Sequence, residues 1–222
     1  MQKRGFIIGN YDTARLWTLT GWEFAPAEQE TNYINVPGRR KGPLDMSTAL
    51  TDGDPVYLSR TLTATFECSE GTRLERKQWI REMVNALDGR QWDIVFPDDP
   101  HLYVVGRVRI TTLYNDPAHA SVSLTAICEP WKYNRAETVV VLTATAAKQV
   151  ATLTNSGRLL VTPTVTITGS GASVLIECET ATYALGEGVY TLPELYVPQG
   201  ETVFTYSGTG TATITYREAV IE

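Results

Sequence analysis

The stretch Tyr33-Ile-Asn-Val-Pro-Gly-Arg-Arg-Lys-Gly-Pro-Leu-Asp-Met-Ser47 decides how the first half of this chain is interpreted. Its start has the composition of a strand, which we expect over Asn32–Val36. The Pro-Gly and Gly-Pro steps then predict a turn, and the Leu-Asp-Met segment a short apolar return. Further along, Tyr57-Leu-Ser-Arg60 leads into Thr61–Cys68, where apolar and polar side chains alternate as in a strand. The pattern around this stretch is therefore β in character.

One helix follows that strand. The spacing predicts a helix over Arg73–Leu87, with Thr72 as N-cap, Glu75 closing a capping box and Gly89 just beyond the C-terminus. Its apolar face consists of Trp79, Ile80, Met83, Val84 and Leu87. Its charged side chains, expected on the opposite face, are Arg76, Lys77, Arg81 and Glu82.

More strands surround the helix. Alternation predicts them at Trp17–Trp22, Trp92–Phe96, Tyr103–Thr111 and Ala120–Glu129. The turn Pro97-Asp-Asp-Pro-His101 joins the second and third as a hairpin.

The composition changes near Arg135. All five tryptophans and both histidines precede it, and threonine is the commonest residue after it. Residues 136–222 hold 3 Lys+Arg against 8 Asp+Glu, a net charge of −5 out of −6 for the chain. We therefore predict two domains, residues 1–135 and 136–222.

The second domain has no helical periodicity. Short strands are predicted near 138–144, 149–153, 163–168, 173–179, 189–192, 202–206 and 211–216. Glycine-rich turns such as Gly169-Ser-Gly171 and Gly208-Thr-Gly210 are expected to separate them. About seven short strands at this spacing favour a β-sandwich, so the fold class is mainly β with one helix.

Composition also restricts function. The three cysteines, Cys68, Cys128 and Cys178, are scattered, which favours free thiols over disulfides or zinc. The acidic balance argues against nucleic-acid binding, and the longest aliphatic run, Val139–Leu142, is too short to span a membrane. No secretory signal is recognisable, so we expect a protein that is made and kept in the cytoplasm until assembly or lysis. No cofactor is predicted.

Asp98, Asp99 and His101 form the best cluster for catalysis or metal binding, because paired carboxylates can divide acid and base roles or hold a cation. Both aspartates lie in a proline-bounded turn, where aspartate is favoured for local hydrogen bonding, and we prefer that interpretation.

Two basic groups are candidate contacts. Arg39, Arg40 and Lys41 form a compact cationic tip, more typical of a solvated loop or a contact between subunits than of DNA binding. Arg107 and Arg109 alternate with apolar residues, which places both on the polar side of a strand, facing either solvent or a neighbouring subunit.

Residues 10–133 resemble the N-terminal ring domain of siphophage distal tail (Dit) proteins. The resemblance rests on an ordered set of features. They are Pro26 with Glu28, the turn Val36-Pro-Gly-Arg39 followed by Leu44-Asp45, Tyr57 with Arg60, the helix, Trp92–Phe96, Asp98-Asp99, Tyr103–Arg107 and Pro130-Trp131. The corresponding turn of the family is usually shorter. In this chain Arg40 and Lys41 stand between Arg39 and Gly42.

This resemblance implies a virion protein without enzymatic activity. It implies a ring of six copies that joins the tail tube to the host-adsorption apparatus and lets DNA pass through its bore. The implied partners are the tail tube protein, the tail-associated hub protein, the tape-measure protein and a receptor-binding protein. It also implies a galectin-like sandwich for residues 136–222 and assembly in the host cytoplasm.

Two other functions stay open at this point. The second domain could be a carbohydrate-binding module that uses tyrosines such as Tyr196, although it contains no tryptophan for sugar stacking. A hydrolase that uses Asp98, Asp99 and His101 is the weaker alternative.

Overall fold

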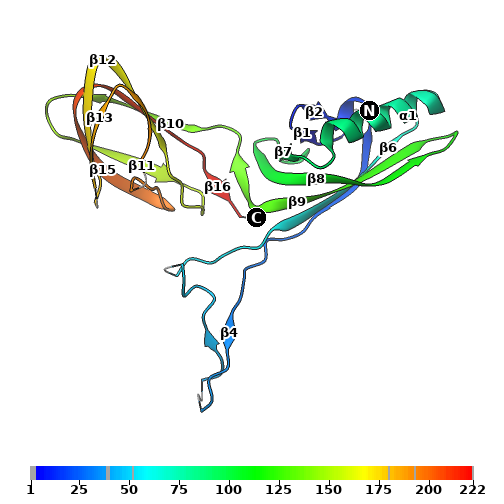
Figure 1. Cartoon of the computed structure of the whole chain (residues 1–222), viewed down its shortest axis with the longest axis horizontal. Helices are drawn as coiled ribbons and strands as arrows, with labels where there is room; N and C mark the ends of the chain where they lie inside the picture. Colours follow the sequence, from blue (N-terminus) through cyan, green and yellow to red (C-terminus); the bar gives the residue numbers. More distant parts are fainter. Residues whose placement is uncertain (1–3, 39–40, 52, 180, 193, 222) are drawn as a thin grey trace. The chain divides into compact units, whose positions relative to one another are not determined.

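The computed structural model describes residues 4–38, 41–51, 53–179, 181–192 and 194–221. Contacts divide the chain into two units, one ending at Lys132 and the other running from Tyr133 to Ile221. Both are built almost entirely of strands, so the prediction of a mainly β chain with one helix is confirmed (Figure 1). No helix in the described residues is long and apolar enough to cross a membrane. The ring-forming role assigned to residues 1–135 stays a prediction.

One sheet organises the first unit, in the order β2-β1-β7-β8-β9-β6-β3. The strands are β1 (Ile7–Ile8), β2 (Tyr11–Asp12), β3 (Thr18–Phe24), β6 (Arg60–Cys68), β7 (Gln91–Val95), β8 (Leu102–Asn115) and β9 (Ala120–Asn134). A short 3-10 turn, η1 (Thr13–Arg15), lies between β2 and β3. The central strand β6 pairs antiparallel with both β3 and β9, with Arg60 opposite Cys128 at one end.

Helix α1 (Arg73–Leu87) covers one face of this sheet. The capping box is present: the Thr72 hydroxyl accepts from the Glu75 backbone N–H, and the Glu75 carboxylate accepts from the Thr72 N–H at 2.7 Å. Gly89 adopts φ +73°, the left-handed conformation expected beyond a helix C-terminus. These bounds and caps confirm the predicted helix. The helix was predictable because each of its signals acts over only a few residues.

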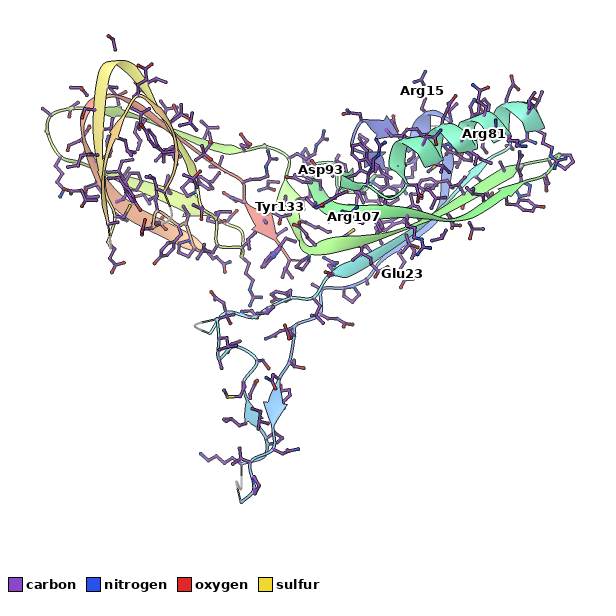
Figure 2. The ribbon with its side chains drawn as sticks, in the orientation of Figure 1. Arg15, Glu23, Arg81, Asp93, Arg107 and Tyr133 are labelled. Atoms are coloured by element: carbon purple, nitrogen blue, oxygen red, sulfur yellow. The ribbon has the colours of Figure 1, made fainter. Side chains whose placement is uncertain are left out.

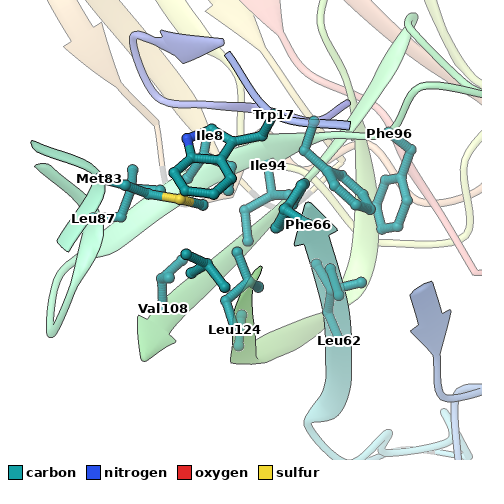
Figure 3. Packing of buried hydrophobic residues seen from close by; sticks show 14 of the residues in the cluster. Ile8, Trp17, Leu62, Phe66, Met83, Leu87, Ile94, Phe96, Val108 and Leu124 are labelled. Atoms are coloured by element: carbon teal, nitrogen blue, oxygen red, sulfur yellow. The ribbon is translucent and has the colours of Figure 1, made fainter. Parts of the chain in front are cut away.

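The core of the first unit lies between α1 and the sheet. Alternate residues of β6 are buried there, and Figure 3 shows Met83 and Leu87 of the helix beside Val108 and Leu124 of the strands (Figure 3). Trp17 is fully buried in this cluster, just before β3 begins. Burial of each such side chain stabilises the fold by about 1.5–3 kcal/mol, because its apolar surface is removed from water.

Arg76 corrects the expected charged face of the helix, because it is only 2% exposed. Its guanidinium donates to the carbonyl oxygens of Gly71 at 2.7 Å and of Asp116 and Pro117 at 2.9 Å each, with a longer bond to Glu70. A buried arginine is tolerated when backbone oxygens satisfy its donors, and here they satisfy both terminal nitrogens, while Nε has no hydrogen-bond partner among the described residues. This side chain therefore joins the start of α1 to the turn between β8 and β9.

The region after β3 contains less regular structure than predicted. In place of a strand over 32–36, Tyr33–Ile34 (β4) pairs with Leu44–Asp45 (β5), and a single bridge joins Gln29 to Tyr57. The strand predicted at Tyr103–Thr111 instead extends from Leu102 to Asn115.

A six-stranded sheet forms the second unit, with the main path β10-β15-β12-β13. Its strands are β10 (Thr138–Ala144), β11 (Gln149–Asn155), β12 (Thr164–Glu177), β13 (Thr182–Gly186), β14 (Gly188–Thr191) and β15 (Gly200–Tyr216). A last short strand, β16 (Ala219–Val220), pairs with β9. The sequence patterns did not predict β13 or β16.

Two expected turns of this unit are bends within strands. The strands predicted at 163–168 and 173–179 form the single strand β12, and those at 202–206 and 211–216 form β15. The glycines between them have positive φ, and β12 and β15 stay paired on both sides of the irregularity. At Gly208 (φ +123°), an added Cβ would lie 2.0 Å from the Ser173 carbonyl oxygen, so no larger residue fits.

Bending brings both halves of the sheet onto one core. Val165 and Ile167 of the first half of β12 belong to the same buried cluster as Val174 and Ile176 of its second half. The sheet is visibly curled in Figure 1. The galectin-like character of this unit stays a prediction.

Candidate assembly surfaces

Residues 25–59, called the arm below, leave the sheet after β3 and return at β6. Figure 1 shows the arm projecting from the sheet as a narrow ribbon, with β4 along its length. Backbone bonds hold its two sides together, from Glu30 N–H to Val56 O at 2.8 Å and from Leu58 N–H to Glu28 O at 2.9 Å. The paired residues Tyr33 with Asp45 and Ile34 with Leu44 continue the ribbon outward.

Large apolar side chains of the arm are exposed. They are Tyr33, Ile34, Val36, Leu50, Val56 and Leu58, with exposed fractions from 36% to 100%. Among the described arm residues, none belongs to the core of the first unit. A ribbon with apolar side chains and no core of its own is a surface suited to binding another protein.

A buried arginine fixes the root of the arm. Arg60 is 4% exposed, and its Nε donates to the Ala25 carbonyl oxygen at 2.7 Å. Its guanidinium carbon lies 3.8 Å from the centre of the Phe24 ring, a cation–π distance. Nearby, the rings of Tyr57 and Trp131 meet edge to face at 5.6 Å. The arm therefore starts from a rigid base, a role for Arg60 that sequence patterns did not reveal.

Of the basic tip predicted at residues 39–41, the structure describes one residue. Lys41 is exposed, whereas Arg39 and Arg40 lie outside the described residues. Their role as contacts stays a prediction.

Asp98 and Asp99 lie in the turn between β7 and β8, as expected. The Asp98 carboxylate accepts from the Arg4 guanidinium at 2.8 Å. The side chain of Arg4 is 74% exposed and that of Asp98 is 48% exposed. The Asp99 backbone N–H bonds to Phe96 O, and the Leu102 N–H bonds to Asp99 O. No group of three side chains suited to hold a metal occurs in the described residues. The arrangement is that of a hydrogen-bonded turn rather than of converging catalytic groups.

Arg107 and Arg109 lie on the outer side of β8, with Val108 buried between them. Figure 2 labels Arg107 on this strand, and its guanidinium donates to the Gly89 carbonyl oxygen at 2.6 Å (Figure 2). Both arginines line a groove of about 610 Å³ with Ile127, which is 65% exposed, and Glu129. The groove combines charge with apolar surface, as protein interfaces do.

A second groove, of about 520 Å³, runs between α1 and β8. Arg73 and Lys77 supply charge, and Leu74, 78% exposed, supplies apolar surface with Leu113 and Tyr114. Sequence reasoning missed this groove. Leu74 is the one residue whose position in the sequence could have indicated this groove, because this leucine lies outside the apolar stripe of the helix.

Hydrogen bonds shape the turn beside this groove. The Asp116 carboxylate accepts from the backbone N–H groups of Ala118 and His119 at 2.7 Å each and from the Tyr114 hydroxyl at 2.9 Å. These bonds, chiefly the one from His119, lower the pKa of the Asp116 carboxyl below its usual value. Three hydrogen bonds to one carboxylate therefore close the turn beside the groove.

The cysteines and tyrosines add no reactive site. All three cysteines are free, and burial raises the pKa of Cys128 to about 12, which keeps it a thiol at neutral pH. In the second unit Tyr206 and Tyr216 belong to the core, while Tyr196 is 43% exposed. An isolated tyrosine on this surface is weak support for a sugar site.

Comparison with known proteins gives a match only at the level of structure. No protein-family description and no curated protein matches the sequence. The crystal structure of the Dit protein of phage SPP1, described as a paradigm of the hub adsorption apparatus in phages that infect Gram-positive bacteria, matches with a TM-score of 0.68. The identity is 17%, over 96% of this chain and 98% of that one.

The chain therefore has a Dit-like fold over 96% of its length. Two structures of the phage P2 baseplate in its activated conformation, with Ca and with Sr, match at TM-scores of 0.46 and 0.47 with 7% and 6% identity. Each covers 94% of this chain and 92% of the other.

Proposed function

We propose that this protein is a structural component of a phage tail tip. In this proposal six copies form a ring that joins the tail tube to the host-adsorption apparatus, and DNA passes through the bore without specific binding. The observation that supports it best is the match to SPP1 Dit, which extends over nearly the full length of both chains. The protein acts by assembly, and no chemical reaction is assigned to it.

The arm supports assembly on physical grounds. Its apolar side chains lack a core in the isolated chain, and Arg60 holds its root in place. Because the arm and the grooves on the sheet differ from each other, contact between the arm of one copy and another surface of the next would be heterologous. Heterologous contacts that close generate rings.

In this proposal the candidate residues are contacts with other subunits or with neighbouring tail proteins. Lys41 lies on the arm, Asp98 and Asp99 lie at the β7–β8 turn, and Arg107 and Arg109 line the groove on β8. The proposed neighbours are the tail tube protein, the hub protein, the tape-measure protein and a receptor-binding protein.

Native mass spectrometry of the purified protein, with negative-stain imaging of the same sample, tests the proposal. We expect hexamers with a central hole. A protein that stays monomeric at about 1 mM, and that is missing from purified virions probed with a specific antibody, would overturn it.

A further inference from the structure

Three cations form a row along α1 and have no ionic partner. Arg73, Lys77 and Arg81 are spaced four residues apart, which places them along one side of the helix. All three are exposed, and none of their side chains forms an ion pair within the part of the chain that the structure describes. The two carboxylates of the helix bond elsewhere, Glu75 to Thr72 and Glu82 to Gln78.

This row does not stabilise the helix. Arg73 is the first residue of α1, at the end where the helix dipole disfavours a cation, and the last turn contains no basic residue. Like charges four residues apart also repel each other along a helix. An anionic group bound beside the start of α1 would relieve this repulsion and interact favourably with the dipole.

Apolar side chains lie beside the first two cations of the row, in the groove between α1 and β8. Leu74 is 78% exposed, Leu113 53% and Tyr114 49%. The Asn115 amide donates to the Arg73 carbonyl oxygen at 3.0 Å, which ties the two walls together at one end. The groove volume of about 520 Å³ lies within the range of roughly 300–1,000 Å³ that is usual for binding pockets.

No carboxylate of the described residues lines this groove. The carboxylate that borders it, Asp116, accepts from the Tyr114 hydroxyl and from two backbone N–H groups, and His119 Nδ1 lies 3.4 Å away. These donors partly compensate its charge, whereas Arg73 and Lys77 are not compensated. The groove is thus cationic in a chain whose net charge is −6.

Charge and shape together specify what the groove can bind. We infer that it binds a segment of another protein in which carboxylates flank a large apolar side chain. The carboxylates would pair with Arg73, which can bind them in a bidentate manner, and with Lys77. The apolar side chain would cover Leu74 and Leu113. Nucleic acid would satisfy the cations but would leave both leucines exposed.

Fluorescence polarisation of labelled peptides, added to the full-length protein, tests the inference. The peptide Asp-Glu-Leu-Phe-Glu-Asp should bind at least about tenfold more tightly than Asp-Glu-Ser-Ser-Glu-Asp, which lacks the apolar anchor, and than Asn-Gln-Leu-Phe-Gln-Asn, which lacks the charges. Lys77→Glu should weaken binding of the first peptide at least about tenfold, because it places like charges opposite each other. Leu74→Ser should weaken it too, through loss of apolar contact.

Arg90→Glu is the matched control, because Arg90 is exposed just beyond the other end of α1 and the change in net charge is the same. It should keep the affinity within about twofold of wild type. Absence of saturable peptide binding, an equal loss in Arg90→Glu, or tighter binding of a decathymidine oligonucleotide would overturn the inference.

Native mass spectrometry of Lys77→Glu separates this inference from the proposed ring. The variant should give the same oligomer as wild type, whatever that oligomer is. A changed oligomer would assign Lys77 to a contact between copies of this chain and would also overturn the inference.

Discussion

The arm and the sheet of the first unit use the same kinds of side chain in opposite ways. In the sheet, β6 places Leu62 and Phe66 in the core with no exposed surface. In the arm, Leu50 is fully exposed and Tyr33 is 61% exposed. Apolar burial in the sheet stabilises the fold of a single chain, whereas the exposed side chains of the arm would gain such burial only by contact with a partner. One domain thus separates the residues that make it fold from those suited to assembly.

The largest expected difference between these regions comes from one leucine in each. Leu62→Ala should lower the free energy of unfolding by about 2–5 kcal/mol, because it removes buried apolar surface and leaves a cavity. Leu50→Ala should change it by less than about 0.5 kcal/mol. Denaturant unfolding of both variants measures this contrast, and equal effects would contradict the separation of the two regions.

Arg76 tests whether the hairpin next to α1 belongs to the stable region. Arg76→Met keeps the length of the side chain but leaves backbone carbonyls at residues 70–71 and 116–117 without their donor. We expect a loss of about 2–4 kcal/mol in unfolding free energy. Arg73→Met, on the exposed side of the same helix, is the control and should stay within about 0.5 kcal/mol. A small effect of Arg76→Met would place the hairpin outside the cooperative core.

The arm should affect assembly without affecting folding. The double variant Tyr33→Ala, Ile34→Ala should leave the unfolding free energy within about 0.5 kcal/mol of wild type. It should weaken assembly at least about tenfold, because it removes exposed apolar anchors. Native mass spectrometry over a dilution series measures the second effect. Leu160→Ala, at a leucine 47% exposed in the second unit compared with 46% for Ile34, is the control. Unchanged assembly in the arm variant would mean that Tyr33 and Ile34 face solvent and are not assembly contacts.

The smallest expected effect compares two aspartates in similar turns. Hydrogen bonds lower the pKa of Asp116 beside the core and of Asp45 in the arm, the latter through Ser47. A lowered folded-state pKa gives stability that is present above the unfolded value, near 4, and is lost as pH falls through the folded pKa. Denaturant unfolding at pH 7 and pH 3 should therefore show that Asp116→Asn destabilises the protein more at pH 7 than at pH 3.

Asp45→Asn should show no such pH dependence in global unfolding, since the arm lies outside the core. A pH-dependent effect of equal size at Asp45 would mean that the arm unfolds together with the sheet.

Local features were predictable, and α1 is the clearest case. Its N-cap, capping box, apolar spacing and terminal glycine each act within a few residues, so its bounds follow from the sequence. The strand β6 was similarly evident from its alternation, apart from its first residue. The turn character of Asp98 and Asp99 also followed from their flanking prolines.

Features that depend on distant contacts were not predictable. Arg76 resembles any charged helix residue until residues 116 and 117 approach it. Gly169 and Gly208 have the composition of turns, and only the pairing of β12 with β15 makes them bends within strands. The exposure of the arm depends on where the rest of the chain lies.

The sequence by itself determined the mainly β class, the single helix with its caps and the uneven charge between the two domains, because propensity, periodicity and charge are properties of neighbouring residues. The tertiary structure decided which polar groups are buried, which strands are continuous and which side chains share a face. The threonines of β12, β14 and β15 show the difference. They are visible in the sequence, but a row such as Thr215–Thr164–Thr191 exists only through strand register, which hydrogen bonds between distant segments fix.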